Sequence, residues 1–175
     1  MKQIKLKDKT FRISIPYEDI SSAIDKVAEK INADFRGCED IPILLCVLNG
    51  SIMFMGELMK RLDFNCQLVS TKLTSYDGTS STGTVKQALG LTADITGRRV
   101  IIVEDIVDSG RTLTHLKEKL LKTDCASVSV CTLLDKPSRR KTDLVPDYCG
   151  FTIEDAFVVG YGLDYDEKYR NLPDV

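Results

Sequence analysis

The chain has 175 residues, of which 43% are hydrophobic and 29% charged, and its formal net charge is −2. This length and composition suit one globular domain over residues 1–175 with a core of its own, and not a disordered or membrane-embedded protein. The mildly acidic balance argues against broad binding of nucleic acid, which usually requires a basic surface.

The first half of the chain alternates short apolar runs with helical patterns. Residues 4–15, interrupted by polar residues at 7–9, predict a short hairpin. One face of an amphipathic helix is then indicated by apolar residues at helical spacing, namely Ile20, Ile24, Val27, Ala28 and Ile31. The apolar run 41–48 predicts a buried strand, because it is too short for a helix. After a turn at 49–51 we expect a second helix, which carries Met53, Phe54, Leu58, Met59 and Leu62.

The second half repeats this alternation. Residues 66–73 predict a strand, and the β-branched run 100–103 predicts another that ends abruptly at Glu104 and Asp105. The next helix has four leucines on one face, Leu113, Leu116, Leu120 and Leu121. Residues 127–134 and 157–159 predict two further strands. Strands separated by helices and nearly continuous in apolar character indicate an α/β fold, with a central, mostly parallel sheet flanked by helices.

The cysteines and the opening of the chain bear on its compartment. Six cysteines occur without a C-x-x-C spacing, and Cys46 and Cys131 lie inside apolar runs, where cysteine packs as a small hydrophobe. Residues 1–7 contain no apolar core of signal-peptide length, and no stretch approaches the roughly 20 apolar residues that span a bilayer. We therefore expect reduced thiols and a cytoplasmic protein without a membrane partner.

The segment 100–112 is the most informative part of the sequence. It is a buried strand that delivers carboxylates to a Ser-Gly-x-Thr turn, which opens a helix. A helix N-terminus offers unpaired N–H groups to a phosphate, and Gly110 lets the backbone approach the anion closely. Ser109 and Thr112 add hydroxyl donors. The Walker pattern G-x-x-x-x-G-K-[ST] is absent, which argues against an ATPase or GTPase.

Three acidic residues accompany this turn. Glu104 and Asp105 are neighbours on a strand, so regular geometry would send their side chains to opposite faces, where they could flank a ligand lying across the strand end. Ribose hydroxyls and a hydrated Mg²⁺ ion suit this arrangement, because Mg²⁺ keeps several waters and takes one or two carboxylates. Asp108 lies nearer the reacting centre and could accept a proton.

The run from Val103 to Thr112 resembles the phosphoribosyl-pyrophosphate signature of the type I phosphoribosyltransferases, and the chain from Leu48 to Arg170 resembles their hypoxanthine-guanine branch. The resemblance implies the type I fold, with a small hood formed by the chain-terminal segments. It implies a purine salvage enzyme that transfers the 5-phosphoribosyl group from phosphoribosyl pyrophosphate to hypoxanthine, guanine or both, giving IMP or GMP and pyrophosphate. Mg²⁺ as cofactor and a homodimer or homotetramer are implied as well.

The same resemblance assigns roles around the phosphate turn. Asp108 becomes the catalytic acid or base that faces purine N7. Glu104 and Asp105 meet the ribose hydroxyls and the metal. The 5-phosphate is expected to bind the residues of the turn itself, which are Asp108, Ser109, Gly110, Arg111 and Thr112.

Two loops are implied to close the site, one at the pyrophosphate and one as a lid. Leu48-Asn49-Gly50-Ser51 resembles the family's pyrophosphate loop, in which a cis peptide bond not involving proline directs backbone N–H groups at the diphosphate. Asn49 stands where many relatives carry lysine or arginine, and taken alone Asn-Gly is an ordinary turn. Ser75 and Tyr76 begin a segment rich in Gly, Ser and Thr that resembles the family's flexible lid.

Purine recognition is implied for a further set of residues. Lys136 is expected to donate to purine O6 and so to select hypoxanthine or guanine over adenine, although on local grounds a lysine there is usually solvated. Phe157 is expected to stack on the base, and Val158 to read its edge through the backbone. Asp164 is implied beside the base with a second Mg²⁺ ion, and Arg170 near the pyrophosphate.

Other interpretations require different residues. A non-catalytic regulator of this fold would keep the phosphate turn but lose Asp108, Lys136 or the lid, and would need a basic face. An enzyme of the same fold for adenine or a pyrimidine is disfavoured by Lys136 and Phe157. A Rossmann dehydrogenase is disfavoured because no G-x-G-x-x-G follows the first strand. His115, the single histidine, is expected on a helix surface, and Arg140 occupies a family-like basic position without a definite role.

Overall fold

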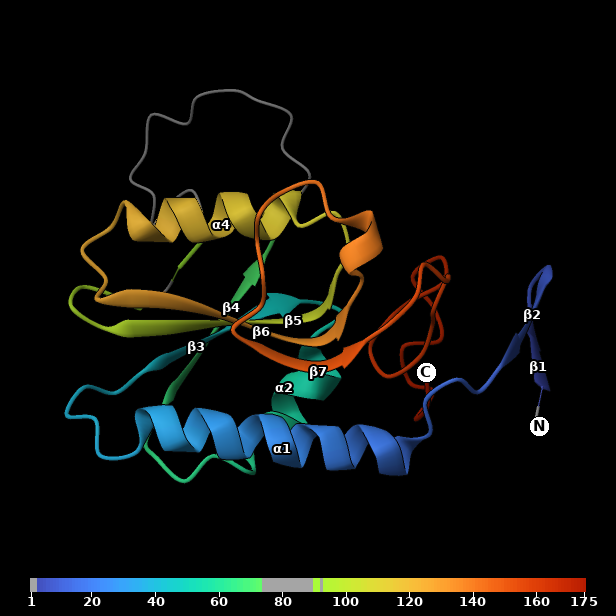
Figure 1. Ribbon diagram of the computed structural model, residues 1–175, viewed down its shortest axis with the longest axis horizontal. Coiled ribbons are helices and arrows are strands. Elements are labelled where there is room, and N and C mark those ends of the chain that lie inside the picture. Colours follow the sequence, from blue (N-terminus) through green and yellow to red (C-terminus); the bar gives the residue numbers. More distant parts are fainter. Residues whose placement is uncertain (1–2, 74–89, 92) are drawn as a thin grey trace.

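A sheet of five parallel strands is the centre of the computed structural model, which describes residues 3–73, 90–91 and 93–175 (Figure 1). The strands are β3 (Ile43–Leu48), β4 (Gln67–Lys72), β5 (Arg99–Val107), β6 (Ser127–Asp135) and β7 (Tyr148–Thr152). Their spatial order is β4-β3-β5-β6-β7. The order therefore reverses between β3 and β5, and ligands of open α/β sheets bind beyond the carboxyl ends of strands at such a point.

Both faces of this sheet are buried. Leu44 and Cys46 of β3 pack with α1 (Tyr17–Phe35) and α2 (Ile52–Met59), while Ile43 and Leu45 pack toward α4 (Arg111–Leu121). Figure 1 shows α4 on one side of the sheet and α1 and α2 on the other. Because alternate residues of one strand face two cores, the central strands β3, β5 and β6 carry nearly continuous apolar runs, as the sequence predicted. In the described ranges no helix is both long and apolar enough to cross a membrane.

β5 extends further than its sequence indicated. Its ladder to β3 ends at the pair Cys46–Val103, but its ladder to β6 continues to the pair Val107–Asp135. The prediction that the strand ends at Glu104 and Asp105 is therefore wrong, because pairing with β6 carries it through both acids. Past Val103 the strand has no β3 neighbour, and this free edge is where the two acids lie.

Other elements also differ from the sequence prediction. Residues 157–159 form no strand. The edge strand next to β6 is β7, which begins nine residues before Phe157. The apolar run 157–159 instead lines a cavity together with residues of both chain termini, with Val159 buried and Phe157 exposed. Leu121 is 54% exposed rather than part of the buried face of α4, and Leu62 follows the end of α2.

The terminal segments form the hood that the family resemblance implied. β1 (Gln3–Leu6) and β2 (Lys9–Arg12) pair as the predicted antiparallel hairpin. The chain end joins the segment after it, since the N–H groups of Ser14 and Ile15 both donate to the Val175 carbonyl oxygen. All six cysteines lie in the described ranges and are unpaired there.

Candidate active site

The loop Leu48–Ser51 follows β3 and leads into α2. Its first peptide bond, Leu48–Asn49, is cis, as the resemblance implied. Ser51 anchors the loop from below: it is fully buried, and its hydroxyl donates to the Val47 carbonyl oxygen at 2.6 Å. The Asn49 side chain is exposed. The loop is thus fixed to the end of β3. It can contact a ligand through its backbone groups, because it has no cationic side chain of its own.

Gly50 brings three segments into direct contact. A Cβ atom built on Gly50 would lie 1.6 Å from Oδ2 of Asp105, and a Cβ atom on Gly162 would lie 2.0 Å from the Gly50 carbonyl oxygen. Both spaces are filled, so neither position has room for a side chain. The loop after β3, the acidic part of β5 and the segment around Gly162 are therefore held against one another at the free edge.

Glu104 and Asp105 do not flank the strand from opposite faces, so that expectation is wrong. The ladder to β6 is interrupted between Glu104 and Ile106, and Oε1 of Glu104 accepts a hydrogen bond from the Asp105 N–H at 3.1 Å. The Ile106 N–H donates to Oδ1 of Asp105 at 2.7 Å. Local contacts thus turn both side chains toward the same cavity.

The two acids perturb each other. Burial raises the pKa of Glu104 well above its ordinary value, and the negative charge of Asp105 raises it further. Burial also raises the pKa of Asp105, although hydrogen bonds and the positive charge of Arg170 oppose that rise. Two partly buried acids side by side favour the approach of a cation or of several hydroxyl donors.

The phosphate turn is tied down from behind by the segment 136–141. Three successive carbonyl oxygens, those of residues 107–109, accept hydrogen bonds from that segment. The donors are, in order, the Lys136 N–H at 2.9 Å, the Arg140 Nε at 3.2 Å and the Lys141 N–H at 2.8 Å. Because these carbonyl groups point at the segment, it is the N–H end of α4, and not these oxygens, that can face an anion on the cavity side.

Gly110 is the N-cap of α4, and its φ of 79° lies in the left-handed region that favours glycine. A Cβ atom there would lie 2.7 Å from Cδ of Arg140 and 2.7 Å from Oγ1 of Thr142. Beside it, Oγ of Ser109 accepts from the Arg111 N–H at 3.4 Å. The glycine is therefore required by the turn conformation and by close packing against Arg140.

Arg140 has a structural role that the sequence left open. Its guanidinium group pairs with Asp135 and donates to the Leu144 carbonyl oxygen, and the side chains of Arg140 and Asp135 are only 12% and 11% exposed. This buried pair joins the end of β6 to the phosphate turn from outside the cavity. The sequence does show two opposite charges, Asp135 and Arg140, on either side of a short turn after a strand, but this pattern alone does not predict that they pair.

Lys136 is buried, contrary to what its local sequence suggested. It is 6% exposed, and its Nζ donates to the Ala156 carbonyl oxygen at 2.5 Å. A buried ammonium group retains further donors, so a ligand acceptor can join this contact. The interaction brings the end of β6 beside the segment that carries Phe157 and Val158.

Phe157 lies against the hood. It is 55% exposed, and its ring centroid is 6.1 Å from that of Phe11 and 5.4 Å from that of Tyr165. The Lys9 ammonium group lies 5.1 Å from the Phe157 centroid. The ring is therefore supported by both ends of the chain while much of its surface stays open.

Asp164 and Arg170 form an ion pair at the other side of the cavity. Nη2 of Arg170 is 2.9 Å from Oδ1 of Asp164, and Nη1 of Arg170 donates to the Gly162 carbonyl oxygen at 2.7 Å. The Glu167 N–H donates to Oδ2 of Asp164 at 2.9 Å. These contacts fix both side chains next to Gly50, which Gly162 touches.

Most of the predicted site residues meet in one cavity of about 330 Å³, here termed the site cavity. It is lined by Leu48, Gly50, the run from Glu104 to Gly110, Thr112, Asp164 and Arg170, together with Val47, Leu73 and Leu113. Asn49, Ser51 and Arg111 adjoin the lining, and Lys136, Phe157 and Val158 lie outside it. Ser75 and Tyr76 fall outside the described residues. His115 is exposed on α4, as expected.

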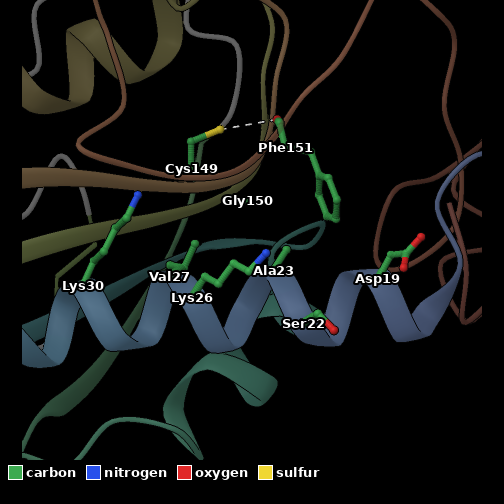
Figure 2. A pocket seen from close by; sticks show the side chains of 9 residues that line it. All are labelled: Asp19, Ser22, Ala23, Lys26, Val27, Lys30, Cys149, Gly150 and Phe151. Carbon is green, nitrogen blue, oxygen red and sulfur yellow. Dashed lines mark hydrogen bonds between the residues drawn. The ribbon is translucent and has the colours of Figure 1, made fainter.

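A second cavity, of about 350 Å³, lies between α1 and the edge strand β7 (Figure 2). Lys26 and Lys30 of α1 and Cys149 of β7 are among its lining residues, and Cys149 Sγ donates to the Phe151 carbonyl oxygen at 3.3 Å. None of the predicted site residues lines it. The two cavities are similar in size, so the acids and the phosphate turn identify the site.

Comparison with known proteins gives consistent matches over nearly the whole chain. A model of the phosphoribosyl transferase domain matches residues 16–166. A hypoxanthine-guanine phosphoribosyltransferase of Streptococcus pneumoniae is 42% identical over 163 residues, which cover 93% of this chain and 89% of that protein. A hypoxanthine-guanine-xanthine phosphoribosyltransferase of Tritrichomonas foetus is 38% identical over 99% of this chain and 94% of its own length. The solved hypoxanthine phosphoribosyltransferase of Trypanosoma cruzi in complex with the product IMP has a TM-score of 0.84 at 32% identity, covering 99% of this chain and 91% of that one.

Proposed function

Because the chain belongs to the phosphoribosyl transferase family, we propose that its site cavity joins a 6-oxopurine to the ribose of phosphoribosyl pyrophosphate. The chain is a purine salvage transferase, which forms IMP or GMP from hypoxanthine or guanine and releases pyrophosphate. The observation that carries the proposal for the cavity is the meeting of three segments at Gly50. They are the loop after β3, the pair of acids on β5 and the segment around Gly162, and the turn that opens α4 lines the same cavity.

Each part of the cavity suits one part of the donor. The N–H groups at the start of α4, with Ser109 and Thr112, would bind the 5-phosphate, because the carbonyl groups of the turn face away. The backbone of the loop Leu48–Ser51 and the Arg170 guanidinium group would hold the pyrophosphate. Glu104 and Asp105 would accept hydrogen bonds from the ribose hydroxyls.

The acceptor base would lie between the phosphate turn and the segment at Phe157. Lys136 would donate to purine O6, Phe157 would stack on the base, and Val158 would contact its edge. Asp108 would hold or accept the proton at N7 as N9 forms its bond to ribose C1. Ser75 and Tyr76 would cover the site during the reaction, since water must be kept from the positively charged sugar centre.

Mg²⁺ is proposed as the cofactor, and the acids fit it. Glu104 and Asp105 are paired and partly buried, and the pKa of each is raised, which a divalent cation would relieve. In the described ranges no three His, Cys, Asp or Glu side chains converge as a metal site, and this matches an ion held chiefly by water and substrate oxygens. Glu104 and Asp105 would hold one ion and Asp164 a second, and bound Mg²⁺ would neutralise charge on the departing pyrophosphate. Chelation should abolish turnover, and added Mg²⁺ should restore it.

We further propose a cytoplasmic homodimer or homotetramer. Apolar residues are exposed at the start of α2, where Ile52 and Met53 are 57% and 37% exposed, and on the edge strand β4, where Leu68 is 50% exposed. A second copy of the chain would cover them. Light scattering should give a dimer or tetramer mass, and Ile52→Glu should lower it. An unchanged monomer mass for the wild type would refute the oligomer.

The experiment for the function is a comparison of bases. The protein, Mg²⁺ and phosphoribosyl pyrophosphate are mixed with hypoxanthine, guanine, xanthine or adenine, and nucleotide formation is followed by absorbance. Nucleotide is expected from hypoxanthine or guanine and none from adenine. A non-catalytic regulator of the same fold would bind the donor but form no nucleotide from any base.

A further inference from the structure

The carboxylate of Asp108 is held by a residue that has no part in the proposed function so far. Arg139, the last residue of the short 3-10 helix η1 (Pro137–Arg139), donates from Nε to Oδ1 of Asp108 at 3.1 Å. Within the part of the chain that the structure describes, Oδ2 of Asp108 accepts no hydrogen bond. One oxygen of the carboxylate is thus fixed while the other remains available.

The same guanidinium group reaches the base segment. Nη1 of Arg139 lies 3.5 Å from Oδ2 of Asp155, two residues before Phe157. Arg139 therefore bridges the phosphate turn and the segment that carries the proposed base-stacking ring. A planar guanidinium group can hold two carboxylates in a fixed relation, which an ammonium group does less well.

We propose that Arg139 is a positioning residue for the reaction: it fixes Oδ1 of Asp108 so that Oδ2 faces purine N7, and Asp155 holds the guanidinium group in place. This inference rests on the proposed function, because it presupposes that Asp108 manages the N7 proton. Arg139 does not touch the reacting atoms and acts through Asp108.

Neighbouring residues make different contacts, so the role of Arg139 can be tested separately from theirs. Arg140 and Lys136 hold the main chain of the turn through its carbonyl groups, and Lys136 also holds Ala156. Arg139 alone of these three contacts the Asp108 carboxylate through its side chain. Replacing it should therefore leave the turn and the proposed phosphate site in place while the carboxylate loses its orientation.

The solvent exposure of the Arg139 ion pairs also allows their effect on catalysis to be distinguished from an effect on stability. The side chains of Arg139, Asp108 and Asp155 are 54%, 44% and 52% exposed, so their ion pairs contribute little to folding in water. A bound base would displace water from the Asp108 side of the contact, and the interaction then strengthens. The effect of Arg139 should thus appear in turnover and not in the melting temperature.

The test is Arg139→Gln, with Arg36→Gln as the matched control. Arg36 also forms an exposed ion pair, with Asp63, but lies far from the site at the end of α1. For Arg139→Gln we expect kcat to fall roughly 10- to 100-fold, as for a misplaced reacting group, with the KM for phosphoribosyl pyrophosphate and the melting temperature unchanged. Arg139→Lys should recover part of the lost kcat, because an ammonium group can still hold one oxygen. Arg36→Gln should behave as the wild type.

Three results would overturn the proposal. They are a wild-type kcat in Arg139→Gln, a loss confined to the KM for phosphoribosyl pyrophosphate, or a drop in melting temperature that accounts for the lost activity. If Arg139→Gln does not fold, Arg139→Lys decides, since kcat and melting temperature both at wild-type values would contradict the need for a planar guanidinium bridge. Failure of the proposed function is distinguishable, because the wild type itself would then form no nucleotide.

Discussion

A methyl group on Gly50 would occupy space that already holds the Asp105 carboxylate. The ideal Cβ position is 1.6 Å from Oδ2 and 2.5 Å from Cγ of Asp105. Non-bonded heavy atoms settle at about 3.5 Å, so Gly50→Ala must separate the two groups by roughly 2 Å. The carboxylate cannot swing away freely, because the Ile106 N–H holds its Oδ1 at 2.7 Å.

We therefore expect Gly50→Ala to damage catalysis more than folding. A displacement of this size at a substrate-binding group should lower kcat/KM for phosphoribosyl pyrophosphate about 100-fold or more. Overpacking typically costs about 1–3 kcal/mol, and in a chain of this length each kcal/mol lowers the melting temperature by about 2–4 °C. The assay is initial-rate kinetics with varied phosphoribosyl pyrophosphate, together with thermal unfolding.

Gly56→Ala is the matched control. Gly56 lies in α2, six residues from Gly50, and a Cβ atom there would meet nothing within 4 Å. Alanine in a helix is more favourable than glycine by about 0.5–1 kcal/mol, so this variant should be slightly more stable and fully active. The reasoning is refuted if Gly50→Ala matches Gly56→Ala in both kcat/KM and melting temperature.

Three further substitutions test separate parts of the site. Asp108→Asn should fold and bind the donor but lose about 10²–10⁴-fold in kcat, and a wild-type rate would remove Asp108 from the mechanism. Lys136→Met leaves the Ala156 carbonyl oxygen unpaired and removes the proposed O6 donor, so kcat/KM for hypoxanthine should fall about tenfold or more. If the variant and the wild type discriminate equally against adenine, Lys136 does not have that role. The folded state raises the pKa of Glu104, so the ligand-free protein gains stability as pH falls through that pKa and is destabilised by the ionised carboxylate above it. Glu104→Gln should therefore raise the melting temperature at neutral pH by about 2–4 °C while lowering activity. An unchanged or lower melting temperature would argue against a destabilising charge at Glu104.

The parallel sheet and the phosphate turn could be predicted because their signals are local. The apolar runs of β3, β5 and β6 are buried on both faces, so each strand is evident in its own residues. The turn at Ser109 and Gly110 joins a strand to a helix within four residues, and its chemistry follows from that junction. The cis bond before Asn49 has no local signal and was implied only by the family resemblance.

The errors concern features that depend on distant partners. β7 contains Gly150 and lacks a long apolar run, and it is a strand because β6 offers it an edge, while the more apolar run 157–159 forms no strand. Lys136 is buried because the Ala156 carbonyl oxygen, 20 residues away in sequence, accepts from its ammonium group. The Glu104 side chain changes direction where the ladder between β5 and β6 is interrupted, and no residue pattern predicts that interruption.

The cavity at the free edge of β5 is proposed to transfer the phosphoribosyl group to a 6-oxopurine. The most direct measurement is simultaneous detection of IMP and pyrophosphate from hypoxanthine, phosphoribosyl pyrophosphate and Mg²⁺, for the wild type and Gly50→Ala side by side. We expect the wild type to form the two products in equal amounts and the variant to form them at least about 100-fold more slowly at low donor concentration. Absence of IMP with the wild type, or equal rates for the two proteins, would contradict the assignment of this cavity.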